Sequence, residues 1–223
     1  MKRQLRDNSL SLVFGGLLLV MLVGQALVGL SGYNQAARTD GLAEIDLWRY
    51  VTSSAFAVDV AENWQSEYLQ FTLYILLTVW LVQRGSSESK PPEQAGFGTD
   101  EEERVGDFAE DGSPWPVKRG GAWAGLFSFS LTMTMATIFL VSWLAQAVTG
   151  RVAYNEERLR DLLDPLPLGA YLVSPDFWGR TLQNWQSELL AVGSMAIFAV
   201  FLRQRGSPES KKVGAPHSET PGS

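Results

Sequence analysis

The sequence predicts an all-α integral membrane protein with four transmembrane helices, arranged as two tandem, parallel-related helical hairpins with partly helical extracytoplasmic loops. Three observations predict this class: four long apolar blocks, charges concentrated between the blocks, and a repeat that runs through most of the chain. Over the whole chain, 46% of the 223 residues are apolar, 19% are charged and the formal net charge is -6. These averages hide the separation of apolar blocks from charged segments. Those values alone would fit a soluble protein.

Each apolar block is long enough to cross a bilayer as a helix. A hydrocarbon core of about 30 Å needs roughly 20 mostly apolar residues that rise about 1.5 Å each. The first block covers about 10–30 and the third about 124–148, and neither contains a charged residue. The second covers about 64–82 and the fourth about 185–202, and each carries one glutamate near its start.

The segments between the blocks differ from them in composition. The longest is rich in Gly, Pro, Ser and acidic residues and has too few apolar residues to form a core, which favours a solvated linker over an acidic docking segment for a basic partner. The predicted parts are a first two-helix repeat at 1–90, an acidic flexible cytoplasmic linker at 91–121, a second two-helix repeat at 122–212, and a disordered tail at 213–223.

Lys and Arg residues predict the orientation, since cytoplasmic flanks of membrane spans carry an excess of them. With both termini and the linker inside, 12 of the 18 Lys and Arg residues lie in cytoplasmic segments and the other six lie in the two outer loops. A multi-pass protein with cytoplasmic N and C termini is therefore expected.

The repeat is predicted to be a tandem duplication. Ser11–Lys90 aligned without a gap on Thr132–Lys211 gives 28 identities in 80 positions. The pentapeptide Asn-Trp-Gln-Ser-Glu at 63–67 recurs intact at 184–188. Because each copy has two spans, both copies enter the membrane in the same direction, and such a parallel repeat favours a static bundle over alternating access.

Helix starts and ends are also repeated. Ser174-Pro175-Asp176 has the N-cap, first-turn proline and acid of a helix start, and Ser53 occupies the same place in the first copy. Arg84-Gly85 and Arg205-Gly206 are typical of helix ends, with a basic residue in the last turn and a glycine cap.

The repeated polar residues are predicted to form one layer near the outer surface. Carboxylates within a membrane are costly, so they face the bundle interior or water and mark candidate sites. Two interpretations stay open: a polar lock that sets helix packing, or a site for an ion, a proton or a small solute. The candidate residues are Glu67, Glu188, Gln25, Gln146, Asn63 and Asn184, with Trp64 and Trp185 as interface anchors.

The composition excludes several classes of chemistry. The chain has no cysteine, and its single histidine, His217, lies in the polar tail. Sulfur-based metal sites, a cysteine nucleophile and a Ser/His pair inside a packed domain are thereby excluded. We therefore expect no cofactor, no metal and no enzymatic activity. We also expect no nucleic-acid partner, because the chain offers no basic face.

The motifs Asn-Trp-Gln-Ser-Glu and Gly-Ser-x-Glu-Ser-Lys, the latter at 85–90 and 206–211, resemble those of a bacterial family of small four-helix membrane proteins of unknown function. The resemblance covers both hairpins and implies a protein of the bacterial inner membrane. It implies no activity and no catalytic residues.

Two functions are therefore considered. The first is a non-enzymatic structural or partner-binding membrane module, which the repeated polar layer locks together. The second is a small channel or carrier that uses Glu67 and Glu188 to bind protons or cations. The expected partners are the lipid bilayer and either a second copy of the chain or another membrane protein.

Overall fold

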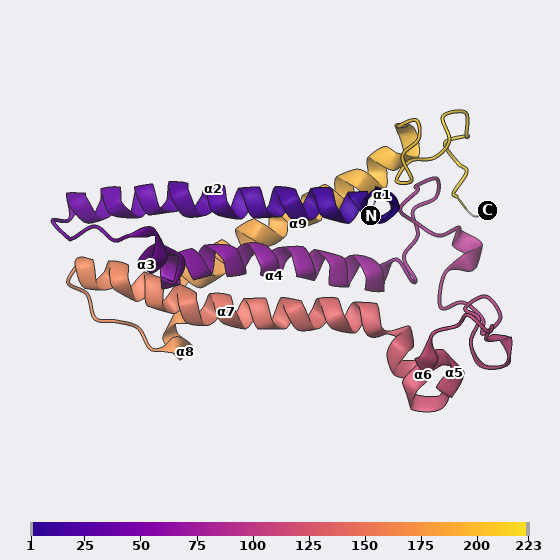
Figure 1. Cartoon of the computed structure of the whole chain (residues 1–223), viewed down its shortest axis with the longest axis horizontal. Helices are drawn as coiled ribbons and strands as arrows, with labels where there is room; N and C mark the ends of the chain where they lie inside the picture. Colours follow the sequence, from indigo (N-terminus) through magenta and orange to yellow (C-terminus); the bar gives the residue numbers. More distant parts are fainter. Residues whose placement is uncertain (1, 222–223) are drawn as a thin grey trace. The chain divides into compact units, whose positions relative to one another are not determined.

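The computed structural model describes residues 2–221 and contains helices, turns and irregular segments but no strand within that range. Met1, Gly222 and Ser223, which the sequence analysis assigned to the first repeat and the tail, lie outside the described residues. Four helices are long: α2 (Ser9–Thr39), α4 (Ser54–Leu77), α7 (Ser130–Arg160) and α9 (Pro175–Phe201) (Figure 1). The prediction of an all-α protein is confirmed for residues 2–221.

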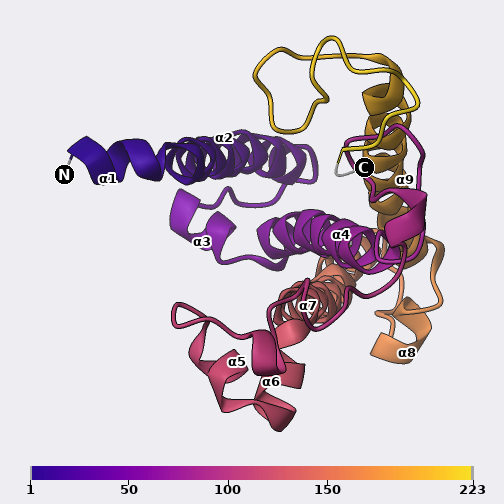
Figure 2. The ribbon, with the colours of Figure 1, turned by 90° about the vertical axis from the view of Figure 1, so that its right-hand side faces the viewer.

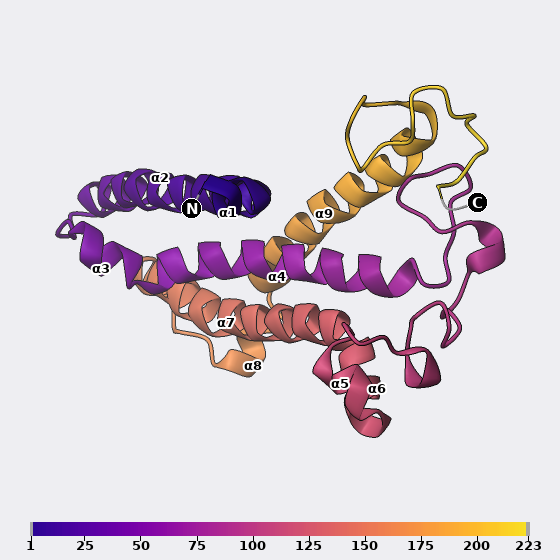
Figure 3. The same cartoon turned by 45° about the vertical axis from the view of Figure 1, so that its right-hand side comes forward.

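Shorter helices occupy the connections. They are α1 (Lys2–Asp7), α3 (Leu47–Val51), η1 (Pro92–Gln94), η2 (Gly106–Phe108), α5 (Trp115–Arg119), α6 (Gly121–Ser128) and α8 (Leu168–Tyr171). The connection from α2 to α4 contains α3, and that from α7 to α9 contains α8. Helices α5 and α6 precede α7 in the chain and lie side by side (Figures 2 and 3).

Two helices, α2 and α7, are long and apolar enough to cross a membrane. Each has 31 residues, which corresponds to about 46 Å at the usual helical rise. Most apolar side chains of α2 are exposed, Val28 at 75% for example. An apolar surface of this extent is unfavourable in water and is typical of contact with lipid or protein. Four spans arranged as hairpins stay a prediction.

Helices α4 and α9 begin where the sequence predicted. The amide of Phe56 donates to Ser53 Oγ at 3.3 Å, and the amide of Phe177 donates to Ser174 Oγ at 3.3 Å. Each serine thus satisfies an amide that has no partner inside the helix.

The predicted helix ends are wrong. Helix α4 ends at Leu77 and α9 at Phe201, both ahead of the Arg-Gly pairs. Arg203 Nη1 donates to the carbonyls of Val200 at 3.0 Å and Ala199 at 3.3 Å, so a side chain caps the last turn of α9. Gly85 and Gly206 have φ values of 86° and 85°, a region that favours glycine, and they form turns after the helices.

The third predicted span also differs from the structure. The helix is interrupted at Phe129, between α6 and α7, so that the apolar helix is Ser130–Arg160 and not 124–148. Ser128 Oγ donates to the carbonyl of Ala124 at 2.8 Å, and Ser130 Oγ donates to that of Phe127 at 2.7 Å. Such local hydroxyl bonds compete with the helical ladder and favour a bend.

The chain divides into two compact units. The first contains Met1–Ala61 and Ala145–Phe177, and the second contains Glu62–Leu144 and Trp178–Ser223. Each unit therefore combines segments from both predicted repeats.

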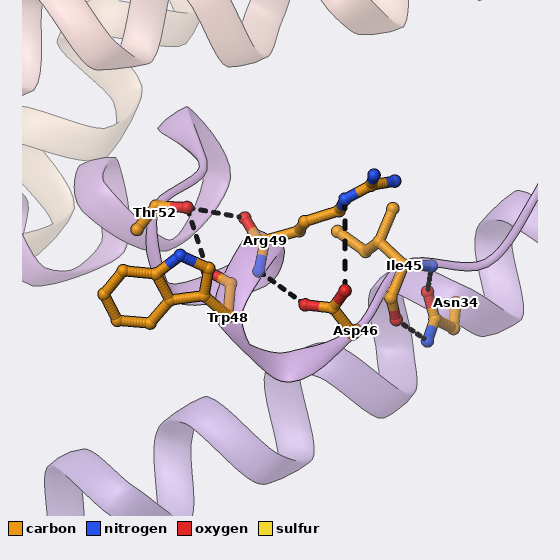
Figure 4. A network of polar contacts seen from close by, with 6 residues as sticks. All are labelled: Asn34, Ile45, Asp46, Trp48, Arg49 and Thr52. Carbon is orange, nitrogen blue, oxygen red and sulfur yellow. Dashed lines mark hydrogen bonds and ion pairs between the residues drawn. The ribbon is translucent and has the colours of Figure 1, made fainter.

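In the first unit an asparagine closes each loop that follows a long helix. Asn34 Nδ2 donates to the carbonyl of Ile45 at 2.9 Å and Asn34 Oδ1 accepts from its amide at 3.0 Å (Figure 4). Asn155 makes the same two bonds to Leu166, at 3.0 and 2.8 Å. Asp46 caps α3 by accepting from the amide of Arg49 at 2.9 Å. These bonds fix where each loop turns back toward the next helix.

A buried tyrosine follows each of these loops. Tyr50 packs against Tyr33 and Phe56, with ring centroids 5.9 and 5.6 Å apart. Tyr171 packs against Tyr154 and Phe177, with both centroids 5.7 Å away. A Cβ added at Gly29 or Gly150 would overlap the hydroxyl of Tyr50 or Tyr171, respectively. Glycine at these two positions therefore lets the tyrosine ring reach the helix backbone.

Candidate functional site

The candidate site is a set of polar contacts between α4 and α9 in the second unit. The repeated pentapeptide lies within α4 at 63–67 and within α9 at 184–188, and α9 runs obliquely past α4 in Figure 3. Both copies are in uninterrupted helix, so neither asparagine is an N-cap. The side chains of the pentapeptide therefore point out around each helix, and only some of them can meet the other helix.

Gln65 is the central residue of this contact. Its side chain is 0% exposed, and its Oε1 accepts a hydrogen bond of 2.7 Å from Nε1 of Trp185. Within residues 2–221, Gln65 Nε2 has no hydrogen-bond partner. An amide buried in this way is costly unless it is paired, so the bond from Trp185 offsets part of that cost.

An ion pair lies one turn of α4 ahead of Gln65. Arg180 Nη1 is 3.2 Å from Glu62 Oε2, and the two side chains are 34% and 17% exposed. Asn184 Nδ2 donates to the carbonyl of Arg180 at 2.9 Å, within α9. The partly buried charge pair is screened less by solvent than an exposed one.

The two repeated glutamates lie within electrostatic range of each other. The carboxyl group of Glu188 lies near the hydroxyls of Ser66 and Ser187 and within range of the carboxyl group of Glu67. Ser66 is buried, Glu188 is partly buried, and Glu67 is exposed. The two repeated glutamates therefore differ in exposure, and only Glu188 is partly buried.

An aromatic cluster surrounds Trp185. The ring of Trp143 lies 5.9 Å from that of Trp185, 6.3 Å from that of Trp178, and 5.7 Å from that of Phe139, on which it stacks. Phe139 and Trp143 belong to α7, so this helix packs against the polar contact of α4 and α9 within the second unit. Large aromatic surfaces of this kind contribute much of the packing energy at helix contacts.

The other predicted residues have different surroundings. Gln25 and Gln146 belong to the first unit, where Gln146 is fully buried and Gln25 is partly buried. Asn63 and Trp64 are exposed, as an interface position would require. The prediction that all six polar residues form one layer stays a prediction.

Sequence reasoning missed the residues that carry the contact: Glu62, Gln65, Ser66, Trp143 and Arg180. Gln65 and Ser66 lie inside the repeated pentapeptide, but the prediction of a site rested on its charged glutamates. Glu62 and Arg180 have no counterpart of the same type in the other copy, so a search for identities could not find them.

The motif Gly-Ser-x-Glu-Ser-Lys folds into a closed loop in both copies. The amides of Gln83 and Gln204 donate to Ser89 and Ser210 Oγ, both at 2.8 Å. Lys90 Nζ donates to the carbonyl of Gly96, and Lys211 Nζ donates to that of His217, both at 3.0 Å. In each copy the lysine thus closes the loop on a residue six positions further along.

The described residues 2–221 contain no group of three His, Asp or Glu side chains that could hold a metal ion. The candidate site offers amide, indole, hydroxyl and carboxyl groups. These groups can bind one another across helices and can exchange protons, but the site has no activated nucleophile beside a base.

These features define an all-α protein with two helices able to cross a membrane and a polar contact that joins two further helices. A family model described as "Domain of unknown function (DUF6766)" matches residues 1–222, and the chain belongs to this family. No curated protein and no solved structure matches the chain.

Proposed function

We propose that this chain is a non-enzymatic membrane module, structural or partner-binding, whose second and fourth spans are locked together by polar side chains. The observation that carries the proposal is the bond from Trp185 to Gln65, because it joins the two copies of the pentapeptide through a fully buried amide. Polar bonds of this type hold membrane helices together where apolar surface gives no preference between lipid and protein.

The proposed architecture has four spans in two parallel hairpins, with both termini cytoplasmic in a bacterial inner membrane. Equal spacing of the helices supports the duplication: α2 and α7 begin at 9 and 130, α4 and α9 at 54 and 175, and α3 and α8 at 47 and 168. Each pair is separated by 121 residues, the same offset that aligns the two pentapeptides. The paired asparagine bonds and lysine bonds have the same offset.

A second candidate is a small channel or carrier that binds a proton or a cation at Glu67 and Glu188. The equivalent places of Glu67 and Glu188 in the two copies of the pentapeptide favour it, because carboxylates within membrane spans mark candidate sites for ions and protons. The extensive side-chain contacts around Gln65 and Trp185 favour the lock.

Single introduced cysteines test the topology, since the chain has no native cysteine. Glutamate variants distinguish the lock from the channel or carrier. A membrane-impermeant maleimide added to intact cells should label Ser31→Cys and leave Ser218→Cys unlabelled. The lock predicts that Glu67→Gln and Glu188→Gln do not change proton or cation flux in liposomes that contain the purified chain. Loss of a measurable flux in these variants, with the fold intact, would establish the channel or carrier instead.

A further inference from the structure

The loop at 204–213, which follows α9, surrounds a cavity of about 470 Å³. Three basic residues and no acidic residue line it: Arg205, Lys211 and Lys212. The cavity is therefore suited by charge to an anion.

The three basic residues have different roles. Lys211 is 4% exposed, and its Nζ donates to the carbonyls of Pro216, His217 and Glu219 at 3.1, 3.0 and 3.0 Å. Its ammonium is committed to shaping the loop. Arg205 and Lys212 are exposed, and neither side chain has an ion pair or hydrogen bond among residues 2–221. These two cations are available to a ligand.

The first copy indicates which kind of atom this loop accepts. In the loop at 83–90, the amide of Gly85 donates to Thr220 Oγ1 at 2.8 Å, and Gly85 is buried. The equivalent Gly206 is exposed and has open space around its α-carbon, and its amide has no acceptor within residues 2–221. The second loop thus presents an amide at the position where the first loop holds an oxygen atom.

The two loops otherwise share their internal bonds. The amides of Glu88 and Glu209 donate to Ser86 and Ser207 Oγ at 3.1 and 3.2 Å. The cavities beside the two loops differ in charge, because Glu88 and, from the second loop, Glu209 line the cavity beside the first loop, whereas no carboxylate lines the cavity at 204–213. The first loop therefore serves as an internal comparison that should not attract an anion.

We propose that the loop at 204–213 binds a phosphate group through the side chains of Arg205 and Lys212 and the amide of Gly206. Arginine offers two parallel donors to phosphate oxygens, lysine adds a point charge, and backbone amides complete such sites. The phosphate belongs to an anionic lipid headgroup or to a free phosphate. Binding of a lipid headgroup rests on the proposed function, because α9 must then end at the cytoplasmic surface of the membrane. Binding of free phosphate does not depend on the proposed function.

The experiment uses the full chain, purified in detergent and stripped of lipid. Native mass spectrometry measures binding of phosphatidylglycerol, of phosphatidylcholine and of inorganic phosphate. We expect phosphatidylglycerol to bind in preference to phosphatidylcholine. In Arg205→Gln/Lys212→Gln its affinity should fall roughly 10- to 30-fold, since each basic residue near a headgroup contributes about 1 kcal/mol. The matched control Arg84→Gln, at the equivalent position of the first loop, should bind as the natural chain does.

Each outcome bears on the inference. Inorganic phosphate that binds to the natural chain and displaces the lipid, with both effects lost in the double variant, supports the site with a free phosphate as the source. Equal loss in Arg84→Gln, or unchanged binding of lipid and phosphate in the double variant, overturns the inference. Circular dichroism of the variants separates loss of the site from loss of the fold. The maleimide labelling described above tests the proposed topology separately, so a wrong topology can be distinguished from a missing phosphate site.

Discussion

The indole Nε1 of Trp185 and the side-chain carbonyl of Gln65 are joined by a hydrogen bond of 2.7 Å, with the glutamine completely buried. Trp185→Phe keeps most of the ring and removes the donor, which leaves both ends of the buried amide unbonded. The free energy of unfolding should fall by about 1–3 kcal/mol. Titration with a denaturing detergent, followed by circular dichroism, measures this change.

The control for this variant is Gln65→Leu/Trp185→Phe, in which the polar atoms on both sides are absent. The double variant should be more stable than Trp185→Phe alone, because no buried amide is left unpaired. A stability of Trp185→Phe equal to that of the natural chain would contradict the importance of this bond.

Gly29→Ala should destabilise the first unit by about 1–3 kcal/mol, the usual cost of forcing an extra carbon into a packed contact. The added Cβ would overlap the hydroxyl of Tyr50. Gly24→Ala, in the same helix but with nothing within 4 Å of the added Cβ, is the matched control and should not lower stability. The same denaturation measurement compares the two variants, and equal stabilities would show that Tyr50 moves aside freely.

Asn155→Ala should cost about 1–3 kcal/mol, because the amide and the carbonyl of Leu166 both lose their partner. Asn8→Ala serves as the control, since Asn8 makes one exposed side-chain bond, to the carbonyl of Gln4 at 2.8 Å; its effect should stay within about 0.5 kcal/mol. Asn155→Asp retains the acceptor and loses the donor. Its thermal stability should therefore lie between that of Asn155→Ala and that of the natural chain.

Lys211→Met should release the chain after residue 212. The ammonium of Lys211 binds three carbonyls of that segment, and methionine replaces its length without any donor. Hydrogen exchange followed by mass spectrometry should show faster exchange over 213–221. Lys212→Met, which removes an exposed side chain, should leave exchange unchanged; similar acceleration in both variants would argue against the role of Lys211.

Glu102 should titrate below the ordinary pKa of a glutamate. The amide of Thr99 donates to Glu102 Oε2 at 2.8 Å and lowers the pKa of this carboxyl, with a smaller contribution from the Thr99 hydroxyl. Because the pKa is lowered, the ionised carboxylate stabilises the turn at 99–102 at pH values above the ordinary pKa of glutamate. This stabilisation is lost as the pH falls through the lowered pKa. Carboxyl carbon shifts in NMR should show Glu102 titrating below the ordinary glutamate value, and Thr99→Val, which removes the hydroxyl but keeps the amide, should bring its pKa part of the way back.

Apolar content and block length were enough to predict the four long helices. Apolar blocks predicted helices, and Ser53 and Ser174 predicted where α4 and α9 begin, because N-caps are local and depend on the serine and the amides that follow it. The ends were not predictable in the same way. A basic residue and a glycine are equally suited to a helix end and to the turn that follows it, and the structure uses them in the turn.

The sequence marked only part of the polar contact. The duplicated pentapeptide occupies five positions in each of α4 and α9, and Gln65 and Trp185 within it form the hydrogen bond between the two helices. Which of them face the other helix depends on how each helix is rotated about its axis, and that rotation is set by packing. Gln65 is therefore buried while Glu67 is exposed, although the sequence favoured the glutamate.

The ion pair of Glu62 and Arg180 has a consequence for symmetry. Under the proposed duplication, Glu62 corresponds to Gln183 and Arg180 corresponds to Asp59, so the pair has no counterpart at the exchanged positions. Two identical subunits around a twofold axis must make every contact twice with the same residues. A single chain that holds two copies is free of that requirement, and an assembly of two first halves would set Glu62 against Asp59. Under that duplication the two halves are complementary at this ion pair and are not interchangeable.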